Sequence, residues 1–334
     1  MTRASTAPDA ATAPPPAPSR WTASDVPDQR GRTIVITGAN TGIGFETALV
    51  LARHGANVVL ACRNPQRAAD AQARIAAAAP AGKVSTLELD LASPAAVRQA
   101  AEQLRAEHPR IDVLVNNAGG VRPRHEVTED GFEMTLATNH LGPFAFTGLV
   151  LDQLLKTPDS RIVTVSSIGH RRGVIDFDDL HAERGYRFQH AYFQAKLANL
   201  MFTYELQRRL AQAGARTIAV AAHPGNARTE FGRDMSAFVR VAMSPRLRLL
   251  TSWLMQSPQM GALPSLRAAT DPQVRGGEYY GPPGRAQFTG YPARVESSDR
   301  SHDIEAQRRL WQESERLTGI AYPLSASTVT AHDR

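Results

Sequence analysis

The regular alternation of short apolar runs with longer helical patterns, from Gly31 onward, is the feature that most constrains how this chain folds. Such alternation is typical of βαβ units, in which crossover helices join parallel strands. It predicts an α/β fold built on a single doubly wound (Rossmann) sheet of seven parallel strands, with helices on both faces. The predicted strands are Thr33–Thr37, Asn57–Ala61, Val84–Glu88, Ile111–Asn116, Arg161–Ser166, Thr217–His223 and Glu278–Tyr280.

The two ends of the chain differ in composition from its centre. Residues 1–25 are rich in Ala and Pro and carry few side chains large enough to build a core, so we expect a disordered tail there. No apolar segment of the kind found in export signals occurs in it. We expect the folded domain to cover residues 26–322 and a flexible C-terminal tail to cover residues 323–334.

The alternation loosens over residues 226–272, where Pro245, Pro258 and Pro264 interrupt short amphipathic pieces. This segment follows the carboxyl end of a predicted strand, and ligands bind at that edge of a doubly wound sheet. We therefore predict a helical substrate lid here, with a helical surface insertion as the alternative. Apolar residues in the segment indicate an apolar substrate, although residues of the same kind also build cores. They are Leu249, Leu250, Trp253, Leu254 and Met255.

The charge balance and the cysteine count argue against several classes of protein. The net charge is +6, but the basic residues are mostly arginines spread along the chain, without the cluster that nucleic acid binding favours. Cys62 is the only cysteine, so we expect no disulfide, no thiolate metal site and a reducing compartment such as the cytoplasm. No apolar stretch reaches the ~20 residues that span a bilayer. We expect neither a metal, nor nucleic acid, nor a membrane span.

A glycine-rich turn follows the first predicted strand and opens a helix. Its sequence over residues 37–44, Thr-Gly-Ala-Asn-Thr-Gly-Ile-Gly, allows a tight turn and close approach of a ligand to the backbone. Unpaired N–H groups at the start of the following helix attract a pyrophosphate. A plain strand-to-helix turn is the alternative for an isolated glycine triplet. The predicted dinucleotide-binding residues here are Gly38, Asn40, Thr41, Gly42, Ile43 and Gly44.

The end of the second predicted strand indicates which nicotinamide cofactor is used. An acidic residue at this place would bind the ribose 2′-hydroxyl of NAD, whereas this chain has Cys62 followed by Arg63. Because a guanidinium suits a 2′-phosphate, NADP is favoured over NAD. The alternative is that Arg63 simply faces water.

Tyr192 and Lys196 form the predicted acid/base pair. Residues four apart share a face of a helix, which brings the ammonium near the phenol. Lowering the pKa of a phenol from ~10 to ~7 takes about 4 kcal/mol of preferential stabilisation of the phenolate, which we expect Lys196 and an oxidised nicotinamide to supply. Lysine otherwise occurs only at Lys83 and Lys156, so its presence here indicates a requirement that arginine does not meet.

A serine pair ends the fifth predicted strand, just upstream of the acid/base pair. We predict that the hydroxyl of Ser167 hydrogen-bonds the substrate oxygen. Ser166 is the alternative, because adjacent strand residues point to opposite faces and a shift of one residue reverses the assignment.

Taken in order, these motifs resemble those of the short-chain dehydrogenase/reductase family over roughly residues 30–320. The resemblance implies that Asp90 and Leu91 contact the adenine ring, although an aspartate there also suits a helix N-cap. It implies that the backbone carbonyl of Asn139 holds a water in a proton relay behind Lys196. It also implies that the segment after the fourth predicted strand lines the cofactor cleft and that the turn after the sixth contacts the nicotinamide. They comprise Asn117, Ala118, Gly119, Pro224, Gly225 and Thr229.

Several details are similar to the retinol dehydrogenase and WW-domain oxidoreductase branch of that family. They include Ala61-Cys62-Arg63-Asn64, Lys196-Leu197-Ala198-Asn199 and the long segment between Ser167 and Tyr192. The resemblance implies an NADP(H)-dependent oxidoreductase that interconverts an alcohol and a ketone or aldehyde. A non-catalytic NADP-binding redox sensor is the alternative, and the presence of the Tyr and Lys argues against it.

The resemblance also implies a homodimer, since members of the family often pair through the helix that bears the Tyr and Lys. An apolar stripe of Leu197, Met201 and Tyr204 on this helix is compatible with that contact. The same stripe would equally serve to pack the helix within its own chain.

Overall fold

The computed structural model of this chain describes residues 20–226 and 256–324. Within these ranges eight strands form one sheet, in the order β3-β2-β1-β4-β5-β6-β7-β8. The first seven are parallel to their neighbours, whereas β8 is antiparallel to β7. The strands are β1 (Thr33–Thr37), β2 (Asn57–Cys62), β3 (Lys83–Glu88), β4 (Val113–Asn116), β5 (Arg161–Val165), β6 (Ile218–Ala222), β7 (Tyr279–Gly281) and β8 (Ala293–Arg294).

The doubly wound α/β sheet predicted from the sequence is confirmed, and each of the seven predicted strands lies close to its predicted bounds. The eighth strand was not predicted. It holds only Ala293 and Arg294, which pair with Gly281 and Tyr280. Two residues are too few to show the alternation by which a strand is recognised in a sequence.

The central strands are buried along almost their whole length because helices cover both of their faces. Side chains of successive strand residues point to opposite faces. In β1, Ile34 and Ile36 pack into the core layer on one face, whereas Val35 packs into the layer on the other. All three side chains are fully buried.

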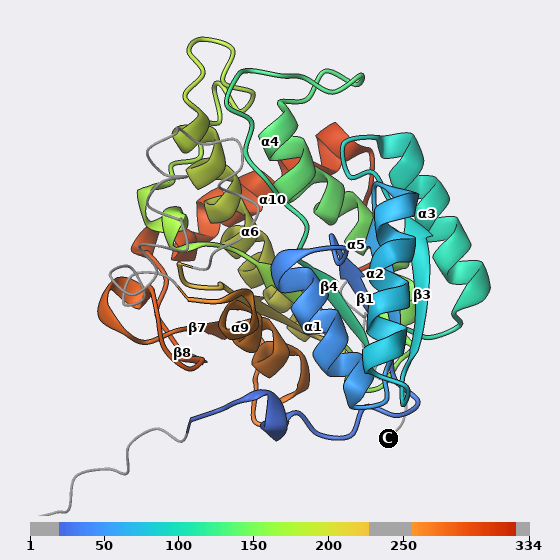
Figure 1. Cartoon of the computed structure of the whole chain (residues 1–334). Coiled ribbons are helices and arrows are strands. Elements are labelled where there is room, and N and C mark those ends of the chain that lie inside the picture. Colours follow the sequence, from blue (N-terminus) through green and yellow to red (C-terminus); the bar gives the residue numbers. More distant parts are fainter. Residues whose placement is uncertain (1–19, 227–255, 325–334) are drawn as a thin grey trace, which may run out of the picture.

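Helices of the described ranges cover both faces of the sheet (Figure 1). One layer contains α1 (Gly42–Arg53), α2 (Pro65–Ala78) and α9 (Pro258–Thr270). The other contains α3 (Pro94–Glu107), α5 (Gly142–Leu155) and α6 (Phe188–Gln212). The short α4 (Met134–Leu136) leads through a π-helical turn (Ala137–Leu141) into α5. None of the helices in the described ranges combines the length and apolar character of a membrane span.

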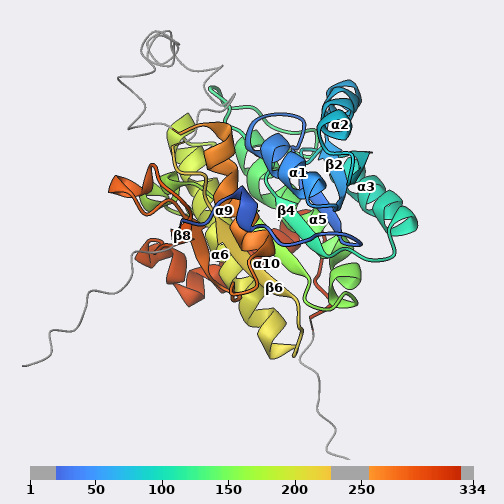
Figure 2. The same cartoon turned by 60° about the horizontal axis from the view of Figure 1, so that its bottom comes forward.

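A last helix, α10 (Ile304–Thr318), packs on the outside of α5 and α6, and the turned view in Figure 2 shows it beside α6. Trp311 anchors it, with its ring 5.1 Å from that of Phe144 on α5 and 5.9 Å from that of Phe202 on α6. Local signals set its ends. The Asp303 side chain accepts the N–H of Ala306 as N-cap, and Gly319, with a φ of 65°, terminates the helix.

The boundaries of the folded domain differ from the predicted ones. Residues 20–25 were assigned to the N-terminal tail, but Trp21 is buried in the core together with Val26, and Ala23–Asp25 forms a turn of 3₁₀ helix. At the other end, Leu324 packs against the core layer of α3 and α5. A single large apolar side chain is enough to attach a segment whose average composition resembles a tail.

The predicted lid over residues 226–272 is only partly within the described ranges, because residues 227–255 and all five of its apolar candidates lie outside them. The rest of the segment is not a lid. Helix α9 packs against α1 in the helical layer on one face of the sheet, and its Leu266 is fully buried. Pro258 starts this helix at a position that needs no N–H donor, and Pro264 lies inside it.

Candidate active site

The glycine-rich turn connects β1 to α1 in the conformation that a dinucleotide loop requires. Gly38 and Gly42 have φ angles of 65° and 59°, a region that favours glycine. Thr41, the N-cap residue of α1, makes no side-chain capping bond. The first N–H groups of α1 therefore receive no side-chain cap and are suited to bind an anion.

The loop after β4 braces this turn. Asn117 donates from Nδ2 to the carbonyl of Thr37 (2.8 Å), and the hydroxyl of Thr37 accepts the N–H groups of Asn117 (3.0 Å) and Ala118 (2.9 Å). A Cβ on Gly44 would lie 2.5 Å from Asn117 Nδ2, and one on Gly38 would lie 3.0 Å from Ala118. The predicted cofactor elements after β1 and β4 are thus in direct contact.

Arg63 and Asp90 follow the adjacent parallel strands β2 and β3 and so lie at one edge of the sheet. Arg63 is exposed directly after β2, as a residue that binds a 2′-phosphate would be. Asp90 accepts the N–H of Ala92 (3.0 Å), but the N-cap of α3 is Ser93. The alternative reading of Asp90 as a helix cap is therefore wrong.

Together these features fit a dinucleotide. The turn at Gly38 and Gly42 leaves its backbone open to a pyrophosphate, the start of α1 offers N–H groups, and Arg63 lies where the 2′-substituent of the adenosine ribose would be. Leu91 is 8% exposed, and its carbonyl is covered by α5, since a Cβ on Gly142 would lie only 2.3 Å from it.

Ser167, Tyr192 and Lys196 come together at the carboxyl end of β5. The Lys196 Nζ donates to the carbonyl of Val165 (3.2 Å) and lies 5.7 Å from the centroid of the Tyr192 ring. The Ser167 hydroxyl lies close enough to the Tyr192 phenol to lower the pKa of that phenol. Ser166 instead donates from its hydroxyl to the carbonyl of Lys196 (2.7 Å). Of the two serines, Ser167 is the one beside the phenol.

The electrostatics of the pair differ from the expectation. Burial raises the pKa of Tyr192 above its ordinary value, and the hydrogen bond with Ser167 lowers it by less. The lowering expected from Lys196 is not seen in this structure. Burial lowers the pKa of Lys196 to about 8, so the lysine stays mostly charged at neutral pH and loses its proton in mildly alkaline solution.

Asn139 lies in the π-helical turn between α4 and α5, and its side chain points toward the lysine. Its Nδ2 donates to the carbonyls of Gly120 and Thr135, both at 2.7 Å. A Cβ on Gly119 would lie 2.3 Å from Asn139 Oδ1 and 3.2 Å from Lys196 Nζ. Among the described residues no donor reaches Oδ1, which leaves a buried acceptor beside the lysine. The sequence gives no sign of the π turn.

The turn after β6 carries the remaining cofactor candidates. Gly225 has a φ of 64°, and its N–H donates to His223 Nδ1 (3.2 Å). The carbonyl of Pro224 accepts from Gln256 Nε2, at 2.5 Å. Thr229, predicted to contact the cofactor, lies outside the described residues.

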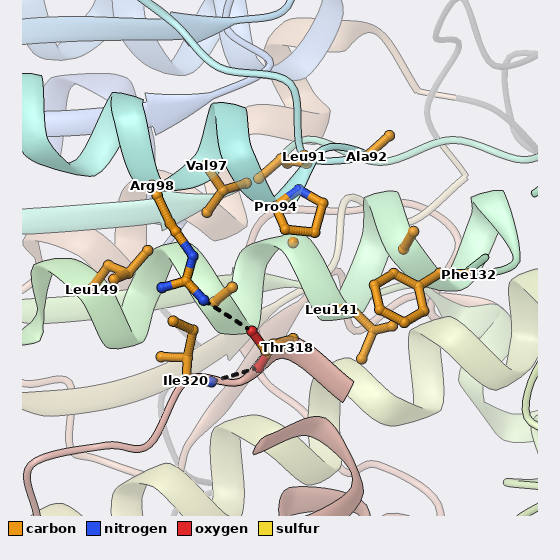
Figure 3. A pocket seen from close by; sticks show the side chains of 13 residues that line it. Leu91, Ala92, Pro94, Val97, Arg98, Phe132, Leu141, Leu149, Thr318 and Ile320 are labelled. Atoms are coloured by element: carbon orange, nitrogen blue, oxygen red, sulfur yellow. Dashed lines mark hydrogen bonds between the residues drawn. The ribbon is translucent and has the colours of Figure 1, made fainter. Parts of the chain in front are cut away.

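An apolar pocket of about 360 Å³, including its open mouth, lies between α3, α5 and the residues after α10 (Figure 3). Leu91, Phe132 and Leu141 line it, and Arg98 bridges its rim to the carbonyl of Thr318 (3.4 Å). Leu91 is the only predicted site residue in its lining. The pocket is therefore separate from the site of Ser167 and Tyr192.

A family model described as short chain dehydrogenase matches residues 32–239. The chain belongs to the short-chain dehydrogenase/reductase family. It is 42% identical to human retinol dehydrogenase 13 over 296 residues, 88% of this chain and 86% of that protein. The resemblance to the retinol dehydrogenase branch is thereby confirmed, and the chain is an oxidoreductase that acts on CH–OH groups.

Two solved structures are similar to this one. A protein from Mycobacterium paratuberculosis, described as uncharacterised, is 38% identical with a TM-score of 0.75, covering 92% of this chain and all of that one. A protein from Beutenbergia cavernae, solved with NADP bound at low occupancy, is 27% identical with a TM-score of 0.58. That match covers 73% of this chain and 92% of the other.

Substitution of Gly44 tests the cofactor turn. Gly44→Ala places a Cβ against Asn117 Nδ2 and the carbonyl of Gly38, so the turn and its brace must move apart. We expect the Kd for NADPH, measured by calorimetry, to rise about tenfold, equivalent to about 1.4 kcal/mol. Gly185→Ala is the control, because a Cβ there meets no atom within 4 Å. An unchanged Kd in Gly44→Ala would contradict the assignment of the turn.

Three buried histidines around the site predict acid sensitivity. Burial lowers the pKa of His140 and His170 to about 4 and that of His223 to about 3, from 6.5. Between pH 6.5 and pH 4 the unfolded chain therefore binds more protons than the folded one, so stability falls as the pH falls through this window. We expect the free energy of unfolding in urea to drop from pH 7 to pH 5 by roughly 2 kcal/mol per histidine.

Single variants separate this effect from the titration of carboxylates. His140→Gln keeps a donor for the hydroxyl of Ser314 while removing one titrating ring, so its loss of stability between pH 7 and pH 5 should shrink by roughly 2 kcal/mol. His190→Gln alters an exposed histidine and should leave the loss unchanged. Equal stability of the unmodified protein at the two pH values would show that the explanation is wrong.

Proposed function

We propose that this protein is an NADP(H)-dependent oxidoreductase that interconverts an alcohol and a ketone or aldehyde, with Tyr192 as general acid/base. The observation that carries the proposal is the meeting of Ser167, Tyr192 and Lys196 at the end of β5, beside the braced glycine turn. When bound, the nicotinamide supplies or accepts the hydride. The protein supplies the proton and holds the oxygen.

Ser167 orients the substrate oxygen. Its Oγ already accepts the N–H of Gly169 (3.1 Å), so its own hydrogen is directed away from that bond. The Ser167 hydroxyl then donates to the carbonyl oxygen from beside the Tyr192 phenol. Two donors on one oxygen stabilise the negative charge that develops there.

Tyr192 protonates that oxygen during reduction and takes the proton back during oxidation. The phenolate form of Tyr192 requires stabilisation, because burial disfavours its negative charge. Lys196, held by the carbonyl of Val165, supplies positive charge close to the ring while it remains protonated, below its pKa of about 8. Asn139 Oδ1, which has no partner among the described residues, faces the same side of Gly119 as Lys196 and can accept a hydrogen bond from a water that returns the proton through the lysine.

In this proposal NADP is preferred over NAD. The residue that follows β2 is the exposed Arg63 and not a carboxylate. The related protein from Beutenbergia cavernae, described as NAD(P) dependent, was solved with NADP bound, which supports NADP as an acceptable cofactor. The substrate class we propose is an apolar alcohol or carbonyl compound. The name of the human relative, a retinol dehydrogenase, supports an apolar alcohol.

The homodimer implied by the family resemblance needs a surface other than the stripe on α6. Leu197 and Met201 pack against Leu310 of α10, and the hydroxyl of Tyr204 bonds that of Ser297 (2.8 Å). The chain's own C-terminal helix therefore covers this stripe. We propose that α6 serves intramolecular packing.

Replacing Tyr192 tests the acid/base assignment. In Tyr192→Phe we expect kcat/KM with a carbonyl substrate to fall by about a thousandfold, with NADPH binding retained, because only the proton donor is lost. Tyr291→Phe, at a partly exposed tyrosine, is the matched control and should keep its activity. Full activity in Tyr192→Phe would overturn the mechanism. A native protein that binds NADPH but turns over none of a panel of aldehydes, ketones, retinoids and sterols would favour the redox sensor.

Replacing Arg63 tests the cofactor preference. Arg63→Ala should raise KM for NADPH about tenfold and leave KM for NADH nearly unchanged, because a charge-assisted bond to the 2′-phosphate is lost. Arg67→Ala removes another exposed arginine at the start of α2 and should change neither value. Equal effects of Arg63→Ala on both cofactors would contradict the preference for NADP.

A further inference from the structure

His170 lies in the short 3₁₀ turn, Ile168–Arg172, that follows Ser167. Its side chain is fully buried and bridges two parts of the chain that are far apart in sequence. Nδ1 lies 2.7 Å from the carbonyl oxygen of Ser167, and Nε2 lies 3.1 Å from the backbone nitrogen of Ser298. No motif in the sequence points to this histidine.

The partners of the ring determine its tautomer. A carbonyl oxygen can only accept, so Nδ1 carries the hydrogen and donates it to Ser167. A backbone N–H can only donate, so Nε2 is unprotonated and accepts from Ser298. Burial keeps the ring in this neutral form by lowering its pKa to about 4. The imidazole is thus a fixed two-ended connector with both nitrogens satisfied.

The connector holds the backbone of Ser167 through its carbonyl. The Ser167 carbonyl accepts both the Nδ1–H and the backbone N–H of His170, the latter at 3.0 Å. On the same turn the Gly169 N–H donates to Ser167 Oγ. The carbonyl and the hydroxyl of one residue are therefore each held by a hydrogen bond, which restricts the direction in which the hydroxyl points.

The far end of the connector is itself well anchored. The adjacent Ser297 hydroxyl bonds those of Tyr204 on α6 (2.8 Å) and Ser301 (2.7 Å). The His170 ring also packs edge-on against Tyr279 of β7, with the centroids 5.6 Å apart. The segment before α10 thus gives His170 a support that is independent of the Ser167 loop.

We propose that His170 is a positioning residue for Ser167, transmitting the rigidity of the segment before α10 to the hydroxyl that orients the substrate oxygen. The inference rests on the proposed function of Ser167 and Tyr192. It goes beyond that function by placing part of the control of the reaction in a residue that does not contact substrate.

Two substitutions separate the two ends of the ring. In His170→Asn the amide can still donate to the Ser167 carbonyl from the place of Nδ1, while the bond from Ser298 is lost. In His170→Gln the amide oxygen can still accept from Ser298 at the place of Nε2, while the bond to Ser167 is lost. If His170 positions Ser167, kcat should fall about tenfold in His170→Gln and stay within about threefold in His170→Asn, with little change in KM for NADPH.

A double-mutant cycle with Ser167→Ala decides whether the effect passes through the serine hydroxyl. In the Ser167→Ala background, His170→Gln should change kcat by less than about twofold, because the group that it positions is absent. A tenfold loss from His170→Gln in both backgrounds would overturn the proposal. Equal kcat values for His170→Asn, His170→Gln and the unmodified protein, with only the melting temperature lowered, would also overturn it and leave a structural role.

A measurement on the folded unmodified protein keeps the proposal testable if a variant does not fold. The ¹⁵N spectrum of the histidine rings should report an Nδ1–H tautomer for His170 at pH 7, and an Nε2–H tautomer would contradict the proposal. A different result would refute the proposed function. If Tyr192→Phe is fully active, the role of the site is wrong, whereas an inactive Tyr192→Phe with no coupling between residues 167 and 170 refutes only this inference.

Discussion

The backbone carbonyl of Val165, at the end of β5, holds together the parts of the site on which the chemistry depends. It accepts two hydrogen bonds from α6, from Lys196 Nζ (3.2 Å) and from Asn199 Nδ2 (3.1 Å). The next residue, Ser166, donates back to the carbonyl of Lys196 (2.7 Å). Three bonds thus join one strand end to one turn of helix. Tyr192, one turn earlier on α6, is thereby held beside Ser167.

This junction is supported from behind by the C-terminal part of the chain. Trp311 of α10 packs against Phe144 of α5 and Phe202 of α6. The hydroxyl of Ser314 bonds His140 Nε2 (2.8 Å), the neighbour of Asn139, while Ser298 bonds His170. One segment therefore contacts the elements that carry Asn139 and Ser167. The same packing covers the stripe on α6 that a dimer would otherwise use.

Much of the fold could be predicted because parallel strands buried on both faces leave continuous apolar runs in the sequence. The cofactor turn was recognisable for a related reason, since the positive φ angles of Gly38 and Gly42 and the close packing at Gly44 favour glycine. The choice between Ser166 and Ser167 stayed open, because sequence does not fix which face a strand-end residue takes. The bond from Ser166 to the carbonyl of Lys196 shows that Ser166 faces α6, which leaves Ser167 beside the phenol.

Other features had no local signal. The bond from Ser298 to His170 joins residues 128 apart, and the π-helical turn at Asn139 lies where α4 meets α5. The pKa of Tyr192 could not be read from its spacing to Lys196, since burial outweighs a neighbouring hydrogen bond. Trp21 attaches a segment that composition alone assigns to a tail. For His170, Tyr192 and Trp21 the deciding contact is tertiary.

The central claim is that Ser167 and Tyr192 converge on one substrate oxygen. A crystal structure of the protein with NADP⁺ and an alcohol that it cannot oxidise tests this claim most directly. We expect the alcohol oxygen to lie within about 3 Å of both Ser167 Oγ and the Tyr192 hydroxyl, as hydrogen bonding requires. An alcohol oxygen bound beyond hydrogen-bonding reach of either hydroxyl, with NADP⁺ in the turn of Gly38 and Gly44, would contradict it.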